Sequence, residues 1–347
     1  MSVGLPARPM PRRLLSAVLL TALLVGGAPL LTHAPAAAEP AAPAYVALGD
    51  SYSSGTGTRD YIADGTDCQR STSAYPSLIA SARGYALDFR ACSGARVADV
   101  TRAQLSALSA ATSYVTVSVG GNDAGFADVL TECATPWWAG DCDGAIDGAQ
   151  AFVAGTLPGR LSTLYGQIRD AAPNAQVVVV GYPRIFMGED CNALTWFSPE
   201  EQARLNQTAD QLNARTAAVA ASYGFGFADP TGRFVGHAVC DDPEWINGLS
   251  NPIGESYHPN QPGHASGYTP TVSPVLTGSA VTATPRLLAT AAAQADELAA
   301  QQRTYAARDR AIEPTTVRVP DVTSAKARAL AREHGVDLDR WLARQAG

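Results

Sequence analysis

Short apolar runs of strand length alternate with helical stretches along most of the chain, and this pattern constrains the fold most strongly. Continuous apolar runs occupy residues 45–48, 114–119, 177–180 and 225–228, with a weaker run at 87–89. Strands that are apolar on both faces and separated by helices are typical of a parallel sheet covered by helices on its two sides. The sequence therefore predicts a doubly wound α/β domain with one core, of about 240 residues.

The best-marked helix is expected directly after Ser198. This serine can cap the helix, Pro199 suits the first helical position, and Glu201 can bond back to the cap. Gly224 is suited to the left-handed conformation that ends many helices. A helix is therefore predicted from Pro199 to about Tyr223.

Beyond about Gly278 the composition changes to alanine, arginine, glutamine and acids, without further strand signals. A helix with one apolar stripe is predicted to lie on the preceding domain, and the stripe consists of Leu288, Ala291, Ala295, Leu298 and Tyr305. A second helix is predicted from Ser324 to His334. The expected organisation is a signal peptide at residues 1–38, a catalytic domain at 39–278 and a helical C-terminal extension at 279–347.

The first 38 residues have the composition of a secretory signal. Arginines precede an apolar stretch at residues 14–25, and alanines follow at residues 36–38. The apolar stretch is shorter than the roughly 20 residues of a membrane span, so no stable membrane anchor is expected. The paired Arg12 and Arg13 leave both the general and the twin-arginine export routes open. The sequence predicts secretion into the extracellular medium.

Charge excludes several function classes. The net charge is -7, and removal of residues 1–38 subtracts three arginines and no acids, which leaves -10. No binding to nucleic acid is expected from such an acidic chain without a basic patch.

The single lysine, Lys326, lies near the end of the chain, which excludes Schiff-base and phosphate-loop chemistry from the main body. The signature loop of dinucleotide binding is also missing, so no cofactor is expected.

Six cysteines follow the predicted signal. They favour three disulfides over a metal site, because thiols of secreted proteins oxidise and no C-x-x-C pair is present. The consecutive pairings close the shortest loops and are predicted: Cys68 with Cys92, Cys133 with Cys142, and Cys191 with Cys240. The second of these loops carries Trp137 and Trp138, which either pack internally or face a substrate.

A nucleophile is expected where the first apolar run ends. Residues 46–55 read V-A-L-G-D-S-Y-S-S-G, so the run stops at Gly49 and opens into small polar residues that include Ser51. A serine is a weak nucleophile by itself and needs a neighbouring base and donors for the oxyanion. The rest of the sequence must supply both.

Of the five histidines, three are candidates for the base: His237, His258 and His264. His33 leaves with the signal, and His334 lies in the C-terminal extension. His258 is favoured because it follows the last strand, on the side where parallel sheets place their sites, whereas His264 suits the start of the next helix. A metal site at His258 and His264 lacks a third ligand, so no metal is expected.

Two other segments can supply oxyanion donors. The run that ends at Val119 leads into G-G-N-D, where Asn122 presents a side-chain amide. The weaker run leads into C-S-G-A, where Gly94 can expose its backbone N–H. Four separated segments therefore converge on one end of the predicted sheet.

These segments resemble the SGNH (GDSL) hydrolase family over roughly residues 44–270. G-D-S-Y-S-S-G, Gly94, G-G-N-D and Y-H-P-N match its four blocks in order. The cysteine spacing is most similar to that of secreted actinobacterial lipases and esterases of the family, whose three disulfides join the same consecutive pairs. The resemblance implies a flavodoxin-like three-layer α/β/α fold with an open site and no metal. It also implies that Ser51 is the nucleophile, that His258 is the base, and that Ser51, Gly94 and Asn122 form the oxyanion hole.

One position departs from the family pattern. The family usually has aspartate three residues before the histidine, whereas this chain has Glu255. Two alternatives remain open for the group that orients His258. It is either the Glu255 carboxylate or a main-chain carbonyl, that of Glu255 or Ser256.

The predicted function is that of a secreted carboxylic ester hydrolase, a lipase or esterase acting on fatty acyl esters through a Ser-His acyl-enzyme mechanism. Phospholipase A is the next alternative. A carbohydrate acetyl esterase would be expected to use aromatic platforms, yet aromatic residues make up only 7% of the chain. A binding protein that kept the fold and lost catalysis is disfavoured by the intact blocks. A monomer is expected, with at most transient contact with lipid surfaces.

Overall fold

The protein is described by a computed structural model over residues 41–345. The predicted signal peptide at residues 1–38 lies outside the described residues. Within residues 41–345, no helix has the length and apolar character that crossing a membrane requires.

Five parallel strands form one sheet in the order β2-β1-β3-β4-β5. Their bounds are β1 Ala44–Gly49, β2 Ala86–Phe89, β3 Thr112–Ser118, β4 Gln176–Val180 and β5 Gly226–Ala228. The chain adds β2 on one side of β1 and β3 on the other, so the strand order reverses between β1 and β3. This is the flavodoxin-like order, in which ligands bind where the reversal occurs. The predicted strands and fold class are confirmed.

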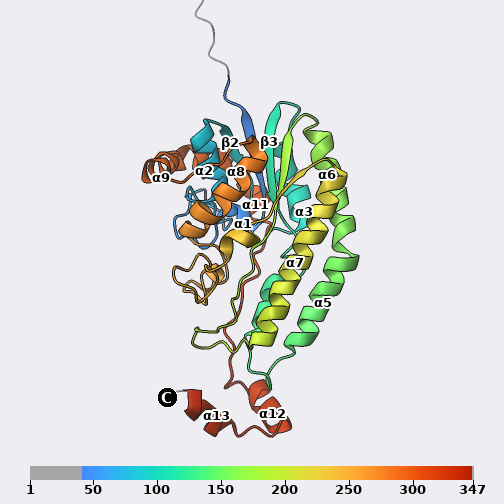
Figure 1. The fold of residues 1–347 in the computed structure, drawn as a ribbon, viewed down its shortest axis with the longest axis vertical. Coiled ribbons are helices and arrows are strands. Elements are labelled where there is room, and N and C mark those ends of the chain that lie inside the picture. The colour runs from blue at the N-terminus through green and yellow to red at the C-terminus, as the bar shows by residue number, and fades with distance from the viewer. Residues whose placement is uncertain (1–40, 346–347) are drawn as a thin grey trace, which may run out of the picture. The chain divides into compact units, whose positions relative to one another are not determined.

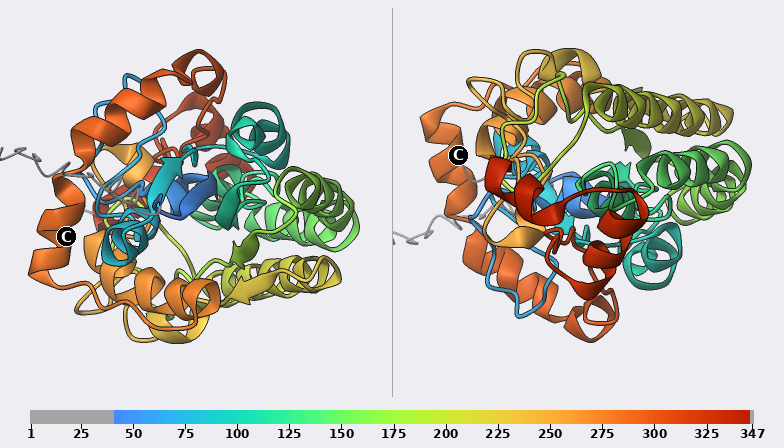
Figure 2. Two further views of the ribbon diagram at one scale, coloured as in Figure 1. Left: turned by 90° about the horizontal axis from the view of Figure 1, so that it is seen from above. Right: turned by 90° about the horizontal axis from the view of Figure 1, so that it is seen from below.

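Helices cover both faces of the sheet (Figures 1 and 2). On one face lie α2, α8 and α9, and on the other lie α3, α5, α6 and α7. Their bounds are α2 Tyr75–Arg83, α3 Val97–Asp99, α5 Cys142–Gly155, α6 Leu157–Ala171, α7 Pro199–Ser222, α8 Thr269–Thr277 and α9 Pro285–Ala292. The remaining helices are α1 Ser51–Ser54, α4 Phe126–Cys133, α10 Ala295–Arg303, α11 Ala306–Asp309, α12 Ala325–Glu333 and α13 Leu338–Gln345. The sheet between these layers is the centre of the apolar core.

The capped helix predicted after Ser198 is confirmed as α7. The Ser198 Oγ accepts from the Glu201 N–H at 3.2 Å, and the Glu201 carboxylate accepts from the Ser198 N–H at 2.8 Å. Gly224 follows the helix with φ 67°, the left-handed conformation expected there. These signals involve residues three or four positions apart, which is why the sequence reveals them.

The single striped helix predicted near residues 288–305 is wrong. Two helices, α9 and α10, stand in its place and are separated at residues 293–294. The break redirects the chain, because α9 packs on α2 whereas α10 packs beside the edge strand β2. The predicted helix from Ser324 is confirmed as α12, which Ser324 caps through a bond from the Ala327 N–H.

The last two helices pack on the loop between α4 and α5. Trp138 is 1% exposed and meets Trp341 of α13 edge to face, with ring centroids 5.4 Å apart. Trp137 is 69% exposed. Of the two roles considered for this loop, internal packing therefore applies to Trp138.

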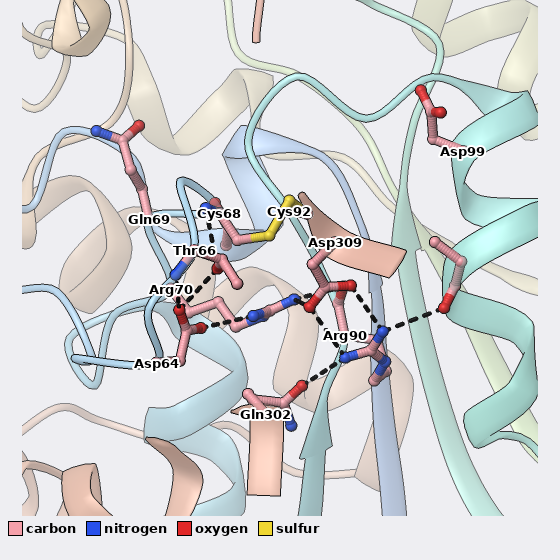
Figure 3. Close-up of a disulfide and its surroundings, with 12 residues drawn as sticks. Asp64, Thr66, Cys68, Gln69, Arg70, Arg90, Cys92, Asp99, Gln302 and Asp309 are labelled. Atoms are coloured by element: carbon pink, nitrogen blue, oxygen red, sulfur yellow. Dashed lines mark hydrogen bonds and ion pairs between the residues drawn. A yellow bond between two sulfur atoms is a disulfide. The ribbon is translucent and has the colours of Figure 1, made fainter. Parts of the chain in front are cut away.

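Three disulfides join consecutive cysteines: Cys68–Cys92, Cys133–Cys142 and Cys191–Cys240. The first ties the loop after α1 to the segment after β2. Figure 3 shows this disulfide beside a buried group of charged side chains, in which Asp309 of the C-terminal extension lies between Arg70 and Arg90. The extension therefore contacts the interior of the preceding domain.

Candidate active site

Ser51 stands where β1 ends and the short helix α1 begins. The Asp50 carboxylate caps α1 by accepting from the Tyr52 N–H at 3.0 Å. The Gln104 amide fixes the preceding Gly49, whose N–H donates to Oε1 at 2.7 Å and whose carbonyl accepts from Nε2 at 2.9 Å. Gly49 has φ 125°, and a Cβ there would lie 2.3 Å from the Ser118 carbonyl oxygen of β3. Only glycine fits this close approach of the two strand ends.

The structure brings Ser51 and His258 together. The Ser51 Oγ lies 2.8 Å from His258 Nε2, and His258 Nδ1 lies 2.9 Å from the Ser256 carbonyl oxygen. A carbonyl can only accept, so Nδ1 carries the proton and Nε2 is free to accept one from the serine. Desolvation of the ring lowers the pKa of His258 to about 4, against the opposing effect of the Ser256 carbonyl. The imidazole is therefore neutral near pH 7, as a general base must be.

The Glu255 carboxylate has other partners. It is buried and accepts from Arg59 Nε at 2.7 Å and from the Tyr61 hydroxyl at 2.8 Å. Of the two alternatives for orienting His258, the structure thus places the Ser256 carbonyl, and not the Glu255 carboxylate, against Nδ1.

Replacing Glu255 with glutamine is expected to lower kcat tenfold or less, about 1.4 kcal/mol. The acceptor that holds His258 belongs to the main chain and survives the substitution. The measurement is kcat on a soluble ester, with circular dichroism to verify folding. Tyr61→Phe is the matched control, since it removes a neutral donor to the same carboxylate. A loss greater than about 1000-fold in a folded variant would establish the Glu255 carboxylate as the third catalytic group.

The proposed oxyanion donors lie beside this pair. Asn122 follows β3, and its Nδ2 donates to the Ala95 carbonyl at 3.1 Å, which places the amide at the turn that contains Gly94. Gly94 has φ 82°, the left-handed conformation that favours glycine. Ser51, Gly94, Asn122 and His258 line one cavity of about 350 Å³. The four segments singled out in the sequence therefore meet in space.

The other candidate histidines lie elsewhere. His264 is buried, and its Nδ1 accepts from the Tyr75 N–H at 3.4 Å. His237 stacks on Trp245 with ring centroids 3.7 Å apart. Neither lines the cavity with Ser51. Among residues 41–345, no group of three His, Cys, Asp or Glu side chains is placed to hold a metal ion.

Sequence reasoning missed two tyrosines that position the site. The Tyr52 hydroxyl donates to the Tyr257 carbonyl at 2.7 Å and joins the nucleophile turn directly to the histidine loop. The Tyr182 hydroxyl donates to Asp50 Oδ2 at 2.5 Å and holds the same turn from the end of β4. Burial raises the pKa of Asp50 to about 7, although the bonds that its carboxylate accepts from the Tyr182 hydroxyl and the Tyr52 N–H oppose that shift. Tyr52 and Tyr257 both belong to blocks found in the sequence, but the bond between them spans 205 residues and is visible only in the structure.

A second, apolar pocket opens from the same serine. Ser51, Asn122 and Phe126 line both pockets, whereas His258 lines only the first. The apolar pocket is narrow, about 80 Å³, and side chains of α4, α5 and α7 form its walls, among them Val129, Leu130, Val153, Leu205 and Leu212. The nucleophile therefore stands between an apolar slot and a larger, more polar cavity that contains the base, called the polar cavity below.

Residues 47–266 match the model of the GDSL-like lipase/acylhydrolase family. The chain belongs to this family. Lipase 1 of Streptomyces coelicolor is 46% identical over 263 residues, which cover 74% of this chain and 95% of that lipase. Family membership makes the protein a carboxylic ester hydrolase.

Two solved structures of similar proteins agree with the fold. Phospholipase A1 from Streptomyces albidoflavus NA297 has a TM-score of 0.64 at 42% identity, and an extracellular lipase from Streptomyces rimosus has a TM-score of 0.63 at 41% identity. Each match covers 69% of this chain and 100% of the other. About 31% of this GDSL hydrolase lies outside each match. Its first 40 residues account for only part of that share.

Proposed function

We propose that the protein is a secreted lipase or esterase that hydrolyses fatty acyl esters through an acyl-Ser51 intermediate. His258 Nε2 takes the Ser51 proton as Oγ attacks the ester carbonyl. The N–H groups of Ser51 and Gly94 and the Asn122 amide stabilise the oxyanion. The imidazolium then protonates the leaving alcohol, and water repeats the sequence on the acyl-enzyme. The Ser51–His258 contact of 2.8 Å carries this proposal.

The arrangement of the pockets supports a different side for each half of the ester. The alcohol receives its proton from His258 and must leave on the side where His258 is exposed, which is the polar cavity. The acyl chain then occupies the apolar slot between α4, α5 and α7. Fatty acyl chains suit such a slot, because each buried methylene contributes about 0.8 kcal/mol.

Secretion is supported by the disulfides and by the relatives. The described residues contain no free cysteine, which is typical of proteins that fold in an oxidising environment. A similar structure is that of an extracellular lipase. We propose that the protein acts as a monomer, with no more than transient contact with lipid surfaces.

A panel of p-nitrophenyl esters with increasing acyl length, run beside phosphatidylcholine and acetylated xylan, tests the proposal. We expect kcat/KM to rise from the acetate to longer acyl chains, since these fill the apolar slot. Phosphatidylcholine is included because a phospholipase A1 is among the similar structures. Activity confined to acetyl groups would favour a carbohydrate acetyl esterase. Failure to hydrolyse any ester would favour a binding protein with this fold.

A further inference from the structure

A segment of the C-terminal extension crosses the polar cavity. Residues 313–318, called the strap here, connect α11 with the segment that leads to α12. Pro314, Thr315 and Thr316 line the same cavity as Ser51 and His258. In Figure 1 this part of the chain runs through the middle of the fold, beside α1, before it reaches α12.

The strap contacts the rim of the cavity at two places. At the first place, a Cβ added to Gly94 would lie 2.4 Å from Pro314 Cα, so the strap packs directly on the turn that holds an oxyanion donor. At the second place, a Cβ added to Gly254 would lie 3.5 Å from Thr316 Cγ2, next to the histidine loop. The strap therefore connects the two places and forms a wall of the cavity.

The strap is fixed on both sides of its lining residues. Ile312 and Val317 are each only 4% exposed and belong to the main apolar core. The Arg318 N–H donates to the Thr131 hydroxyl of α4 at 3.0 Å. Farther upstream, Asp309 is held between two buried arginines. A segment with anchors on either side is placed to act as a wall against which substrates fit.

Polar side chains contribute much of the cavity wall on this side, beside apolar ones such as Ile62 and Pro314. Apart from the strap threonines, the polar ones include Thr66, Asp67 and Gln69 from the loop that carries the first disulfide. Hydroxyl, carboxylate and amide groups can bond to the hydroxyls of an alcohol, whereas a bulky apolar alcohol would leave them without partners.

We propose that the strap determines which alcohol the enzyme releases and that it favours esters of compact, hydroxyl-bearing alcohols of the glycerol type. This inference rests on the proposed function, because it requires the alcohol to leave through the polar cavity. The strap belongs to the part of the chain predicted as an extension, beyond the family match that ends at residue 266. It adds a wall on the alcohol side, while the acyl slot is built entirely by residues before it.

The test compares two esters of the same acid, glyceryl monobutyrate and 2-naphthyl butyrate. The double variant Thr315→Ala/Thr316→Ala widens the cavity and removes two hydroxyls. We expect the ratio of kcat/KM for the naphthyl ester to that for the glyceryl ester to rise about tenfold. Comparing this ratio between the variant and the unaltered enzyme cancels the different intrinsic reactivity of the two esters. The narrowing variant Thr316→Trp is expected to shift the same ratio in the opposite direction.

Two controls separate a specificity role from a structural one. Val319→Ala changes an exposed residue just beyond the strap, outside the cavity lining, and is expected to leave the ratio unchanged. The acyl-length profile on p-nitrophenyl esters is expected to stay the same in every strap variant. An unchanged ratio, or an equal loss on both esters, would overturn the strap proposal and leave the proposed function intact. Absence of hydrolysis in the unaltered enzyme would instead overturn the proposed function.

Discussion

Replacing Ser51 with alanine is expected to lower kcat on a soluble ester by about 10⁵- to 10⁶-fold, as in a serine protease that loses its nucleophile. The Ser51 hydroxyl is bonded to His258 Nε2 at 2.8 Å, so no other serine can accept the acyl group in this geometry. The turn itself should persist, because Asp50 and Gln104 hold it without the Ser51 side chain. Initial rates and the unfolding midpoint of both proteins provide the measurement.

The matched control is Ser54→Ala, a buried serine in the same helical turn whose hydroxyl donates to the Ser51 carbonyl at 3.3 Å. We expect it to retain at least about a tenth of the activity, because Ser54 does not itself line the cavity and its hydroxyl is bonded to a main-chain carbonyl. A phosphonate directed at serine hydrolases should label Ser51 alone. Labelling of a different serine, or normal turnover by Ser51→Ala, would contradict the assignment of the nucleophile.

Replacing Asp309 with alanine is expected to lower the free energy of unfolding by about 3 to 5 kcal/mol. The Asp309 carboxylate accepts from Arg70 at 2.7 Å and from Arg90 at 2.8 Å, and none of these side chains is exposed. Arg70 keeps a second carboxylate partner, Asp64, at 2.6 Å. Arg90 keeps only Gln302, the Ala103 carbonyl and the ring of Tyr305. The substitution therefore leaves the buried Arg90 guanidinium without a directly bonded carboxylate, with Asp88 as its remaining nearby acid.

Denaturant unfolding of the disulfide-intact protein measures this loss. Asp128→Ala is the matched control, because Asp128 also pairs with an arginine of the extension, Arg318, but both side chains are more than half exposed. Its expected cost is below about 1 kcal/mol. Equal losses in the free energy of unfolding for the two variants would contradict the prediction that the buried ion pairs of Asp309 stabilise the protein more than the exposed pair does. The proposed boundary at residue 278 separates the catalytic groups from the extension, but the ion pairs of Asp309 with Arg70 and Arg90 cross it.

The sequence by itself determined the local elements and the four blocks of the site. The strands at 45–48 and 177–180 appear as apolar runs because both faces of the sheet are covered, so every residue in them must be apolar. The start of α7 follows from Ser198 and Glu201, which bond to each other across one helical turn. Parallel strands then bring their carboxyl ends to one edge, which is why Ser51 and Asn122 could be placed together in advance.

Tertiary structure decided the contacts between residues far apart in the sequence. Whether Glu255 or a carbonyl faces His258 depends on Arg59 and Tyr61, which capture the Glu255 carboxylate from another loop. Arg90 and its counter-charge Asp309 are 219 residues apart. Nothing local in the sequence of the strap marks it as a wall of the cavity, because its contact with Gly94 depends on the path of the chain through α9, which packs on α2, and α10, which packs beside β2. Such pairings depend on the path of the whole chain, whereas a cap or a strand depends on neighbours within a few residues.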